Sequence, residues 1–309
     1  MVESWRQLMD VGLIHFMAYP KATQPPLVQE TVRKLAQDDF WDVLEIKRVD
    51  APGVHAELRA LAEQSGITYG MAAQPSLLGG KLSLNDPDEA GRQAAIAEVK
   101  KCIDGAYELD ARITVVLSGK DPGEADRAQQ LDLLADSLVE LCRYAQDGAT
   151  DYVGWVSLET FDATIDKACL IGPSDRAAAL AAQVRDQVDN FGLTIDLSHL
   201  PLLGETPGEC LSYVGEYLIH THAGNCVMAD HGDAAYGDQH PRFGYPGGEN
   251  DVTELREYVE SLIYAGYFQS DVPTRKPVLS FEVKPVGDED SDLIVAQTKR
   301  TWRRMWAEL

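Results

Sequence analysis

Short runs of apolar and β-branched residues alternate along the whole chain with longer segments whose apolar residues recur every three or four positions. The short runs predict buried parallel strands, and the longer segments predict amphipathic helices that cover them. We expect strands at residues 12–17, 42–47, 67–73, 113–117, 152–158, 193–197, 217–222 and 277–283. We expect helices at residues 28–36, around 58–62, 89–107, 129–144, 174–188, 207–214, 251–265 and 290–308.

Eight strand–helix repeats in 309 residues predict an α/β fold, a single (β/α)8 TIM barrel, which typically needs about 250 residues. The barrel is expected to span residues 1–309 as one domain, with a long irregular insertion at about 223–250. An open, doubly wound sheet is disfavoured because it calls for a Gly-x-Gly-x-x-Gly turn after the first strand. Residues 15–20 contain no glycine.

The last four predicted strands each end in a side chain that can bind a metal ion, namely Glu159, Asp196, His222 and Glu282. Neighbouring strands lie about 4.8 Å apart, so donors at four successive strand ends can encircle one ion. Three carboxylates and one imidazole suit Mn²⁺ or Mg²⁺, with Co²⁺ and Zn²⁺ as alternatives. A single carboxylate at a strand end commonly caps the next helix or pairs with a lysine. The metal hypothesis therefore depends on the occurrence of four donors in succession.

The amino-acid composition argues against some kinds of binding partner. The 50 Asp and Glu residues outnumber 27 Lys and Arg and give a net charge of −23, which repels the phosphate backbone of nucleic acids. No apolar run approaches the roughly 18 residues of a membrane helix, and residues 1–5 lack the pattern of a signal peptide. The five cysteines are scattered, with no Cys-x-x-Cys pair. We expect a cytoplasmic protein with reduced thiols, a small-molecule substrate, and neither a nucleic-acid nor a membrane partner.

Four motifs at these strand ends resemble those of the xylose isomerase-like TIM barrels: Ser157-Leu-Glu159, Asp196-Leu-Ser-His199, Ile219-His-Thr-His-Ala-Gly-Asn225 and Ser280-Phe-Glu-Val-Lys-Pro285. That family includes ketose 3-epimerases, inosose dehydratases, type IV apurinic endonucleases and sugar phosphate isomerases/epimerases. The resemblance implies a metal-dependent isomerase or epimerase that removes a proton α to a carbonyl and passes through an enediolate.

By the same resemblance, Glu159, Asp196, His222 and Glu282 are the metal ligands. Glu159 and Glu282 would also be the acid/base pair, and His199 would contact the substrate or a ligand, or itself move the proton. The resemblance favours His222 over His220 as the ligand, although both point to the same face of an alternating strand. Mn²⁺ is the metal we expect first.

The long loop carries further polar residues. Asp238 and His240 resemble a zinc-binding pair of the endonuclease branch, but that branch needs two more histidines on strands two to four, and His55 is the only histidine between His15 and His199. We expect His240 and Arg242 to contact substrate hydroxyls from a lid, with a solvated loop as the alternative. Lys284 is expected to reach an anionic group or the enolate, with an ion pair to a carboxylate as the alternative.

The sequence departs from the epimerase pattern at two places, and these departures leave the product of the reaction open. Epimerases carry an arginine shortly after the histidine of the seventh strand, and residues 226–229 of this chain contain none. The second departure is the long loop expected at residues 160–173. Such a loop resembles the catalytic subunit of carbon-glycoside deglycosidases, which cleave a 3-oxo-glycoside together with a smaller subunit. Dehydration of a keto-inositol is a third outcome, and a sugar-binding barrel without activity is the non-enzyme alternative. The expected assembly is a homo-oligomer, or a hetero-oligomer with a smaller subunit.

Overall fold

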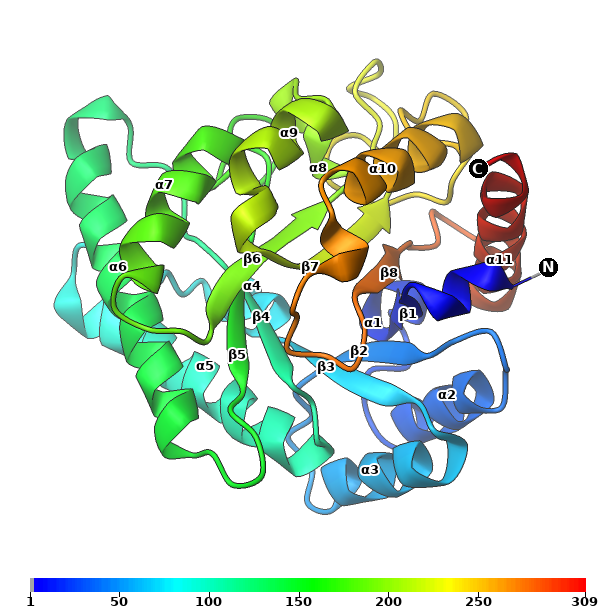
Figure 1. Ribbon diagram of the computed structural model, residues 1–309, viewed down its shortest axis with the longest axis horizontal. Helices are drawn as coiled ribbons and strands as arrows, with labels where there is room; N and C mark the ends of the chain where they lie inside the picture. The colour runs from blue at the N-terminus through cyan, green and yellow to red at the C-terminus, as the bar shows by residue number, and fades with distance from the viewer. Residues whose placement is uncertain (1–2) are drawn as a thin grey trace.

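The computed structural model describes residues 3–309. Eight parallel strands close into a barrel in chain order, β1 next to β8 (Figure 1). They are β1 (Asp10–Ile14), β2 (Val43–Lys47), β3 (Thr68–Ala72), β4 (Ile113–Leu117), β5 (Trp155–Glu159), β6 (Phe191–Asp196), β7 (Leu218–Gly224) and β8 (Val278–Glu282). The predicted (β/α)8 TIM barrel is confirmed.

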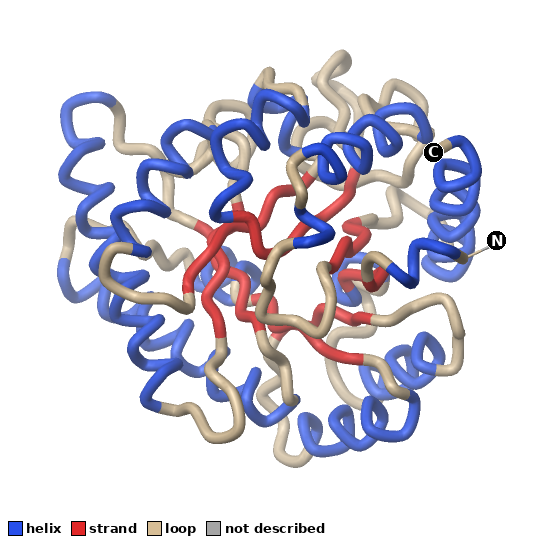
Figure 2. Tube along the Cα trace, in the orientation of Figure 1, coloured by secondary structure: helices blue, strands red, loops and turns tan. Residues whose placement is uncertain are grey.

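One long helix follows each strand and packs on the outside of the barrel, so that helices surround the strands (Figure 2). These helices are α2 (Leu27–Ala36), α3 (Val54–Ser65), α5 (Glu89–Leu109), α6 (Glu124–Asp147), α7 (Ser174–Arg185), α9 (Pro207–Val214), α10 (Val252–Tyr264) and α11 (Ser291–Glu308). Short 3₁₀ turns occur at η1 (Ser4–Gln7), η2 (Gly215–Tyr217) and η3 (Tyr267–Gln269).

Three short helices lie in the loops after strands: α1 (His15–Ala18), α4 (Gln74–Gly80) and α8 (His199–Leu203). The sequence prediction was wrong at all three, because it included α1 in the first strand and left α4 and α8 as loop. Each of the three begins with a buried polar side chain, His15, Gln74 or His199. These helices therefore place polar groups at the C-terminal ends of the strands, where TIM barrels carry their active sites.

Several other boundaries differ from prediction by a few residues. Helix α6 begins at Glu124, five residues before the expected 129, because Glu124 and Asp126 lie in its first turn and interact favourably with the helix dipole. Strand β7 continues to Gly224, past the expected 222. Residues 225–251 contain neither helix nor strand, as expected for the insertion.

The interior of the barrel changes character along its axis. Near the N-terminal ends of the strands, Ile113, Val115 and Ile219 pack together beside Trp155. Further along the barrel, buried polar or charged side chains join the apolar ones, among them Glu159 of β5 and His222 of β7. An apolar layer thus closes the bottom of the barrel and a charged layer lies at its mouth.

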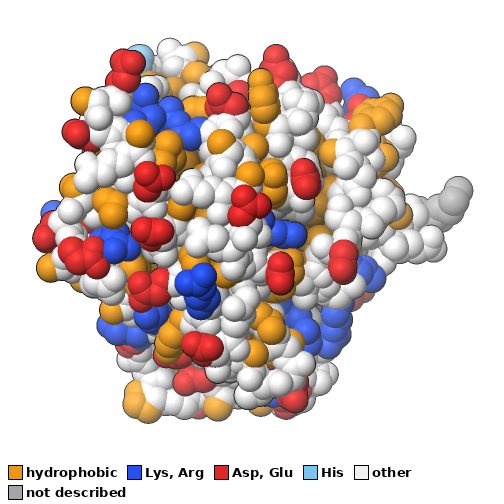
Figure 3. All heavy atoms as spheres, turned by 60° about the vertical axis from the view of Figure 1, so that its left-hand side comes forward, with side chains coloured by type: hydrophobic (Ala, Val, Ile, Leu, Met, Phe, Trp, Pro, Cys, Tyr) orange, Lys and Arg blue, Asp and Glu red, His pale blue; other side chains and the backbone are white. Residues whose placement is uncertain are grey.

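Acidic and basic side chains are interspersed on the face of the molecule shown in Figure 3, over the outer helices. On the outer helices, Lys100 of α5 pairs with Glu140 of α6 at 2.7 Å. Among residues 3–309 no helix combines the length and the apolar character needed to cross a bilayer.

Candidate metal and substrate site

The hydrogen-bond register between neighbouring strands places the polar side chains of β5 to β8 at a similar height along the barrel axis. Glu159 pairs with Thr194, Asp196 with His222, and Gly224 with Glu282. An irregularity between Leu193 and Thr194 shifts the register of β6 against β7 by one residue. This shift brings Asp196 opposite His222, so both side chains lie at the mouth of the barrel.

The four strand-end donors predicted from the sequence lie close together. One donor atom from each of Glu159, Asp196, His222 and Glu282 falls within 4.8 Å of all the others. His222 Nδ1 is 3.0 Å from Glu159 Oε1 and 3.4 Å from Glu282 Oε2. The first three side chains are almost fully buried, and that of Glu282 is 12% exposed.

The charge in this cluster favours a bound cation. In residues 3–309 no lysine or arginine forms an ion pair with Glu159, Asp196 or Glu282; their charged partners are His222 and His240. Asp196 Oδ2 is buried and has no hydrogen-bond partner. Buried carboxylates are costly unless they are paired or coordinate a metal. The donor set and its unpaired oxygen therefore fit a divalent ion with oxygen and nitrogen ligands.

His222 also contacts a carboxylate on the opposite side of its ring. Glu45 of β2 accepts hydrogen bonds from His220 Nε2 at 2.8 Å and from His222 Nε2 at 3.1 Å. Burial alone would raise the pKa of Glu45, but the two histidines outweigh it and hold that pKa well below its usual value. Burial likewise disfavours a charged His222, but Glu45 and Glu159 raise its pKa well above the ordinary value.

A second buried network begins at His199, the first residue of α8. Its Nδ1 donates to the carbonyl oxygen of Thr160 at 2.6 Å, and its Nε2 donates to Asp238 at 3.0 Å. Burial opposes the charge, but Asp238 raises the pKa of His199 to about 10, so both ring nitrogens carry protons at neutral pH. Asp238 also lies 2.7 Å from His240 Nε2 and 3.2 Å from Lys167 Nζ.

The loop after β7 holds His240 over the site. His240 has a left-handed backbone with φ of 52°, and its carbonyl oxygen accepts the amide of Lys284 at 2.7 Å. Burial lowers the pKa of His240, but Glu282 and Asp238 outweigh it and raise that pKa to about 9. Asn225 anchors the loop, since its Oδ1 accepts the amides of Cys226 and Asn250. Non-glycine residues with positive φ are uncommon and are often found at functional sites.

A cavity of about 190 Å³ opens above the cluster. Glu159 and Glu282 line it, whereas Asp196 and His222 do not. The remaining lining residues come from the loops that follow the strands: Phe16, Met17, Gln74, Pro75, Leu78, Phe161, Lys167, Asp238, Gln239, His240 and Lys284. A larger groove of about 900 Å³ lies on the outer wall between α3 and α5, and none of the four donors lines it.

Of the residues expected to contact the substrate, Lys284 lies at the cavity and Arg242 lies away from it. Lys284 lines the cavity, where its Nζ donates to Gln239 Oε1 at 3.3 Å, and it forms no ion pair within residues 3–309. Arg242 Nε pairs with Glu289 at 2.9 Å, and Arg242 is not among the lining residues. The structure thus brings His240 and Lys284 to the cavity but not Arg242.

Sequence reasoning missed two members of the site. Gln74, at the start of α4, donates from Nε2 to Glu159 Oε2 at 2.6 Å, and its Oε1 is buried without a partner. Glu45 contacts His222 from β2, a contact that nothing in the sequence pattern predicts. Position offered a signal only for Gln74, which lies two residues after the end of β3, because Glu45 lies in the middle of β2.

The sequence profile of a family described as "Xylose isomerase-like TIM barrel" matches residues 33–293. The chain belongs to this family. One curated relative of this xylose isomerase-like barrel is the uncharacterized protein MJ1311 of Methanocaldococcus jannaschii, 26% identical over 184 residues. That alignment covers 58% of this chain and 57% of the relative, so the chain matches little more than half of its length.

Three solved structures share the fold of the xylose isomerase-like barrel. An L-ribulose 3-epimerase is 15% identical, with 97% of each chain covered and a TM-score of 0.73. The IOLI protein with a bound zinc atom is 17% identical, with 97% of this chain and 99% of that chain covered and a TM-score of 0.72. The 3-keto-D-glucoside 4-epimerase YcjR of E. coli is 16% identical, with 96% and 99% covered and a TM-score of 0.65.

Proposed function

We propose that this xylose isomerase-like barrel is a divalent-metal-dependent enzyme that removes a proton α to the carbonyl of a keto-sugar or keto-glycoside, in the manner of a sugar isomerase or epimerase. One observation carries the proposal. Glu159 and Glu282 line the cavity and at the same time lie within 4.8 Å of donor atoms from Asp196 and His222. Two carboxylates are therefore available both to a cation and to a substrate.

Glu159, Asp196, His222 and Glu282 would hold the ion, for which Mn²⁺ is our first expectation. When bound, such an ion supplies Lewis-acid polarisation of a substrate carbonyl, which makes the hydrogen on the neighbouring carbon more acidic. Asp196 and His222 do not line the cavity, so their role is limited to holding the ion. The IOLI structure, which shares this fold, holds a bound zinc atom, and this supports a metal-binding role for the present barrel.

Glu159 and Glu282 would move the proton. They come from β5 and β8, which are not neighbours in the barrel, and so approach the cavity from two sides. One carboxylate takes the proton from carbon, the electron pair moves toward the carbonyl oxygen, and the other carboxylate returns a proton to the opposite face. A positioned general base contributes about 10²- to 10⁴-fold to the rate.

His199 and His240 have different roles in this proposal. Both nitrogens of His199 are engaged, with Thr160 and Asp238, so His199 fixes the Asp238 carboxylate. His240 lines the cavity, and we assign its ring to a substrate hydroxyl; its buried Nδ1 lies 3.7 Å from Asp196 Oδ2 and so faces the cluster of donors. Lys284 is the cation we assign to an anionic group of the substrate or to the enolate.

Isotope exchange tests the function. The Mn²⁺-loaded protein is incubated in D₂O with ketohexoses and with 3-oxo-glycosides, and deuterium on the carbon beside the carbonyl is followed by NMR. We expect exchange in the wild type and in Glu98→Gln, whose carboxylate pairs with Arg48 and Lys101 outside the site. Exchange should be lost in Glu159→Gln.

The products separate the possible outcomes of this chemistry. A new epimer identifies an epimerase, whereas release of the aglycone from a 3-oxo-C-glycoside identifies a carbon–carbon lyase. A metal-loaded protein that exchanges no hydrogen in any of these compounds contradicts the proposal and favours a binding protein.

A further inference from the structure

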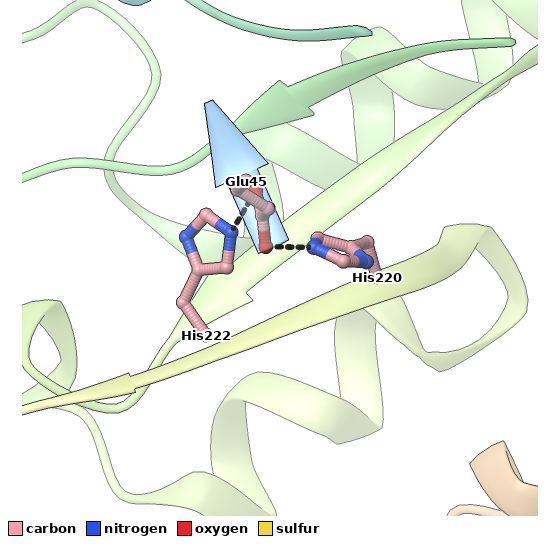
Figure 4. A group of neighbouring side chains, drawn as sticks. All are labelled: Glu45, His220 and His222. Atoms are coloured by element: carbon pink, nitrogen blue, oxygen red, sulfur yellow. Dashed lines mark hydrogen bonds and ion pairs between the residues drawn. The ribbon is translucent and has the colours of Figure 1, made fainter. Parts of the chain in front are cut away.

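Glu45 joins two histidines across the inside of the barrel. Its side chain leaves β2, and Figure 4 shows its carboxylate between the rings of His220 and His222, which both come from β7. Oε1 accepts from His220 Nε2 at 2.8 Å, and Oε2 accepts from His222 Nε2 at 3.1 Å. All three side chains are at most 1% exposed, so no solvent competes for these bonds.

The two nitrogens of His222 face different groups. Nε2 faces Glu45, while Nδ1 lies 3.0 Å from Glu159 and 3.4 Å from Glu282, inside the cluster of donors. A neutral imidazole has one N–H donor and one acceptor nitrogen, and an ionised carboxylate only accepts. When a cation in the cluster displaces the proton from Nδ1, the ring becomes neutral, and Glu45 then holds the tautomer with the remaining proton on Nε2 and the lone pair of Nδ1 directed at the cluster.

His220 fixes Glu45 in turn. Its Nδ1 is buried and has no partner, so a proton on Nδ1 would be an unsatisfied buried donor and the Nε2–H form is favoured. The His220 and His222 rings lie edge to face, with centroids 5.1 Å apart and an angle of 86°. With Oε1 held by His220, the carboxylate keeps Oε2 on His222.

The neighbouring strand leaves room for this arrangement. Gly70 of β3 lies opposite Glu45 in the register, and a Cβ added at Gly70 would come within 2.9 Å of Glu45 Cγ. That is closer than real Cβ contacts, so any larger residue at position 70 would push the Glu45 side chain aside. Glycine at this position lets Glu45 reach across to β7.

We propose that Glu45 is a positioning residue for the metal site: its carboxylate orients His222 and holds the tautomer in which Nδ1 binds the ion. This inference rests on the proposed function, since it assigns the partner of one of the four proposed ligands. Partners that orient a ligand histidine typically contribute about 10- to 100-fold to metal affinity.

Glu45→Gln is the variant that tests this inference most directly. It keeps the shape of the side chain, but its amide has one accepting oxygen and one donating nitrogen, so it can accept from only one histidine. The other histidine must then accept at Nε2 and carry its proton on Nδ1. For His222 this removes the lone pair that would bind the ion, and for His220 it leaves a buried donor unpaired.

The affinity for Mn²⁺ is measured by isothermal titration calorimetry on the full chain, for the wild type, Glu45→Gln and the control Glu98→Gln. We expect Glu45→Gln to bind about 10- to 100-fold more weakly and Glu98→Gln to match the wild type. Wild-type affinity in a folded Glu45→Gln variant overturns this inference and leaves the proposed metal site intact. A wild type that binds no divalent ion overturns both.

A second measurement needs no variant at position 45. Long-range ¹H–¹⁵N spectra of ¹⁵N-histidine-labelled wild type report the protonation of each ring nitrogen, and the His222 signals are those missing from His222→Gln. In the Zn²⁺-loaded protein we expect His222 to carry its proton on Nε2 and to bind zinc through Nδ1. Binding through Nε2, or a proton on Nδ1, overturns the inference even if Glu45→Gln fails to fold.

Discussion

Gln74 donates a hydrogen bond to Glu159 over 2.6 Å, from Nε2 to Oε2, while the other oxygen of Glu159 lies 3.0 Å from His222 Nδ1. The amide thus fixes the orientation of the carboxylate that we propose to move the proton. We expect Gln74→Leu to slow deuterium exchange about 10- to 100-fold while the protein still binds one metal ion. Gln93→Leu, which breaks a similar bond to Glu89 on the surface of α5, is the control. An unchanged exchange rate in Gln74→Leu would show that this bond has no role in the reaction.

Lys284 is predicted to set a preference for charged substrates. It lines the cavity and forms no ion pair within residues 3–309, so its charge is available to a ligand. Because a charge-assisted hydrogen bond contributes about 1.5–3 kcal/mol, Lys284→Gln should raise KM about tenfold or more for keto-sugars that carry a carboxylate or phosphate. Neutral keto-sugars should be affected less. Equal changes for both substrate types would contradict the prediction, and Lys100→Gln on the outer wall controls for the lost charge.

Protonation of His15 should make the stability of the protein depend on pH. Burial lowers its pKa from 6.5 to about 4, while its Nε2 donates to Thr31 Oγ1 at 2.8 Å. Above pH 6.5 neither the folded nor the unfolded state protonates this side chain. As the pH falls from 6.5 to about 4, only the unfolded state takes up a proton, so His15 should cost about 3 kcal/mol of stability over this range.

Urea unfolding at pH 7 and at pH 4.5 measures this loss. His15→Phe cannot be protonated and should lose less stability between the two pH values than the wild type, while the surface substitution His231→Phe serves as the control. Equal losses in His15→Phe and in the wild type would show that His15 does not cause the dependence.

Gly224 is predicted to keep the loop close to the end of β7. A Cβ at this position would lie 2.8 Å from His240 Nδ1 and 2.8 Å from the backbone oxygen of Glu282. Gly224→Ala should therefore destabilise the protein by about 1–3 kcal/mol. Gly208→Ala, in α9 with nothing near the added atom, should be neutral or stabilise by up to about 1 kcal/mol. Thermal unfolding compares the two, and equal melting temperatures would contradict the assigned role of Gly224.

The fold and the four strand-end donors were predictable because each depends on a local pattern. The apolar runs marked the strands, and the topology of a closed barrel brings successive strand ends to one level. Asp196 and His222 could therefore be placed near each other without any knowledge of the loops.

The remaining members of the site depend on contacts between residues far apart in the sequence. Glu45 meets His222 from the other side of the barrel, 177 positions away, and Gln74 meets Glu159 from a short helix that no periodicity revealed. Arg242 was expected at the substrate because of its place in the loop. Its pairing with Glu289 could not be inferred, because it depends on how the loop folds back against the chain after β8.

Metal binding by the purified protein tests the central claim most directly, and Asp196 is the residue to vary because it belongs to the cluster but does not line the cavity. Mn²⁺ is titrated into the metal-free wild type, Asp196→Asn and the control Asp132→Asn on the outer helix α6. We predict about one Mn²⁺ per chain for the wild type and the control, and a loss of at least about 10- to 100-fold in affinity for Asp196→Asn. A folded wild type without affinity for any divalent ion, or an Asp196→Asn variant that binds as tightly as the wild type, would contradict the account.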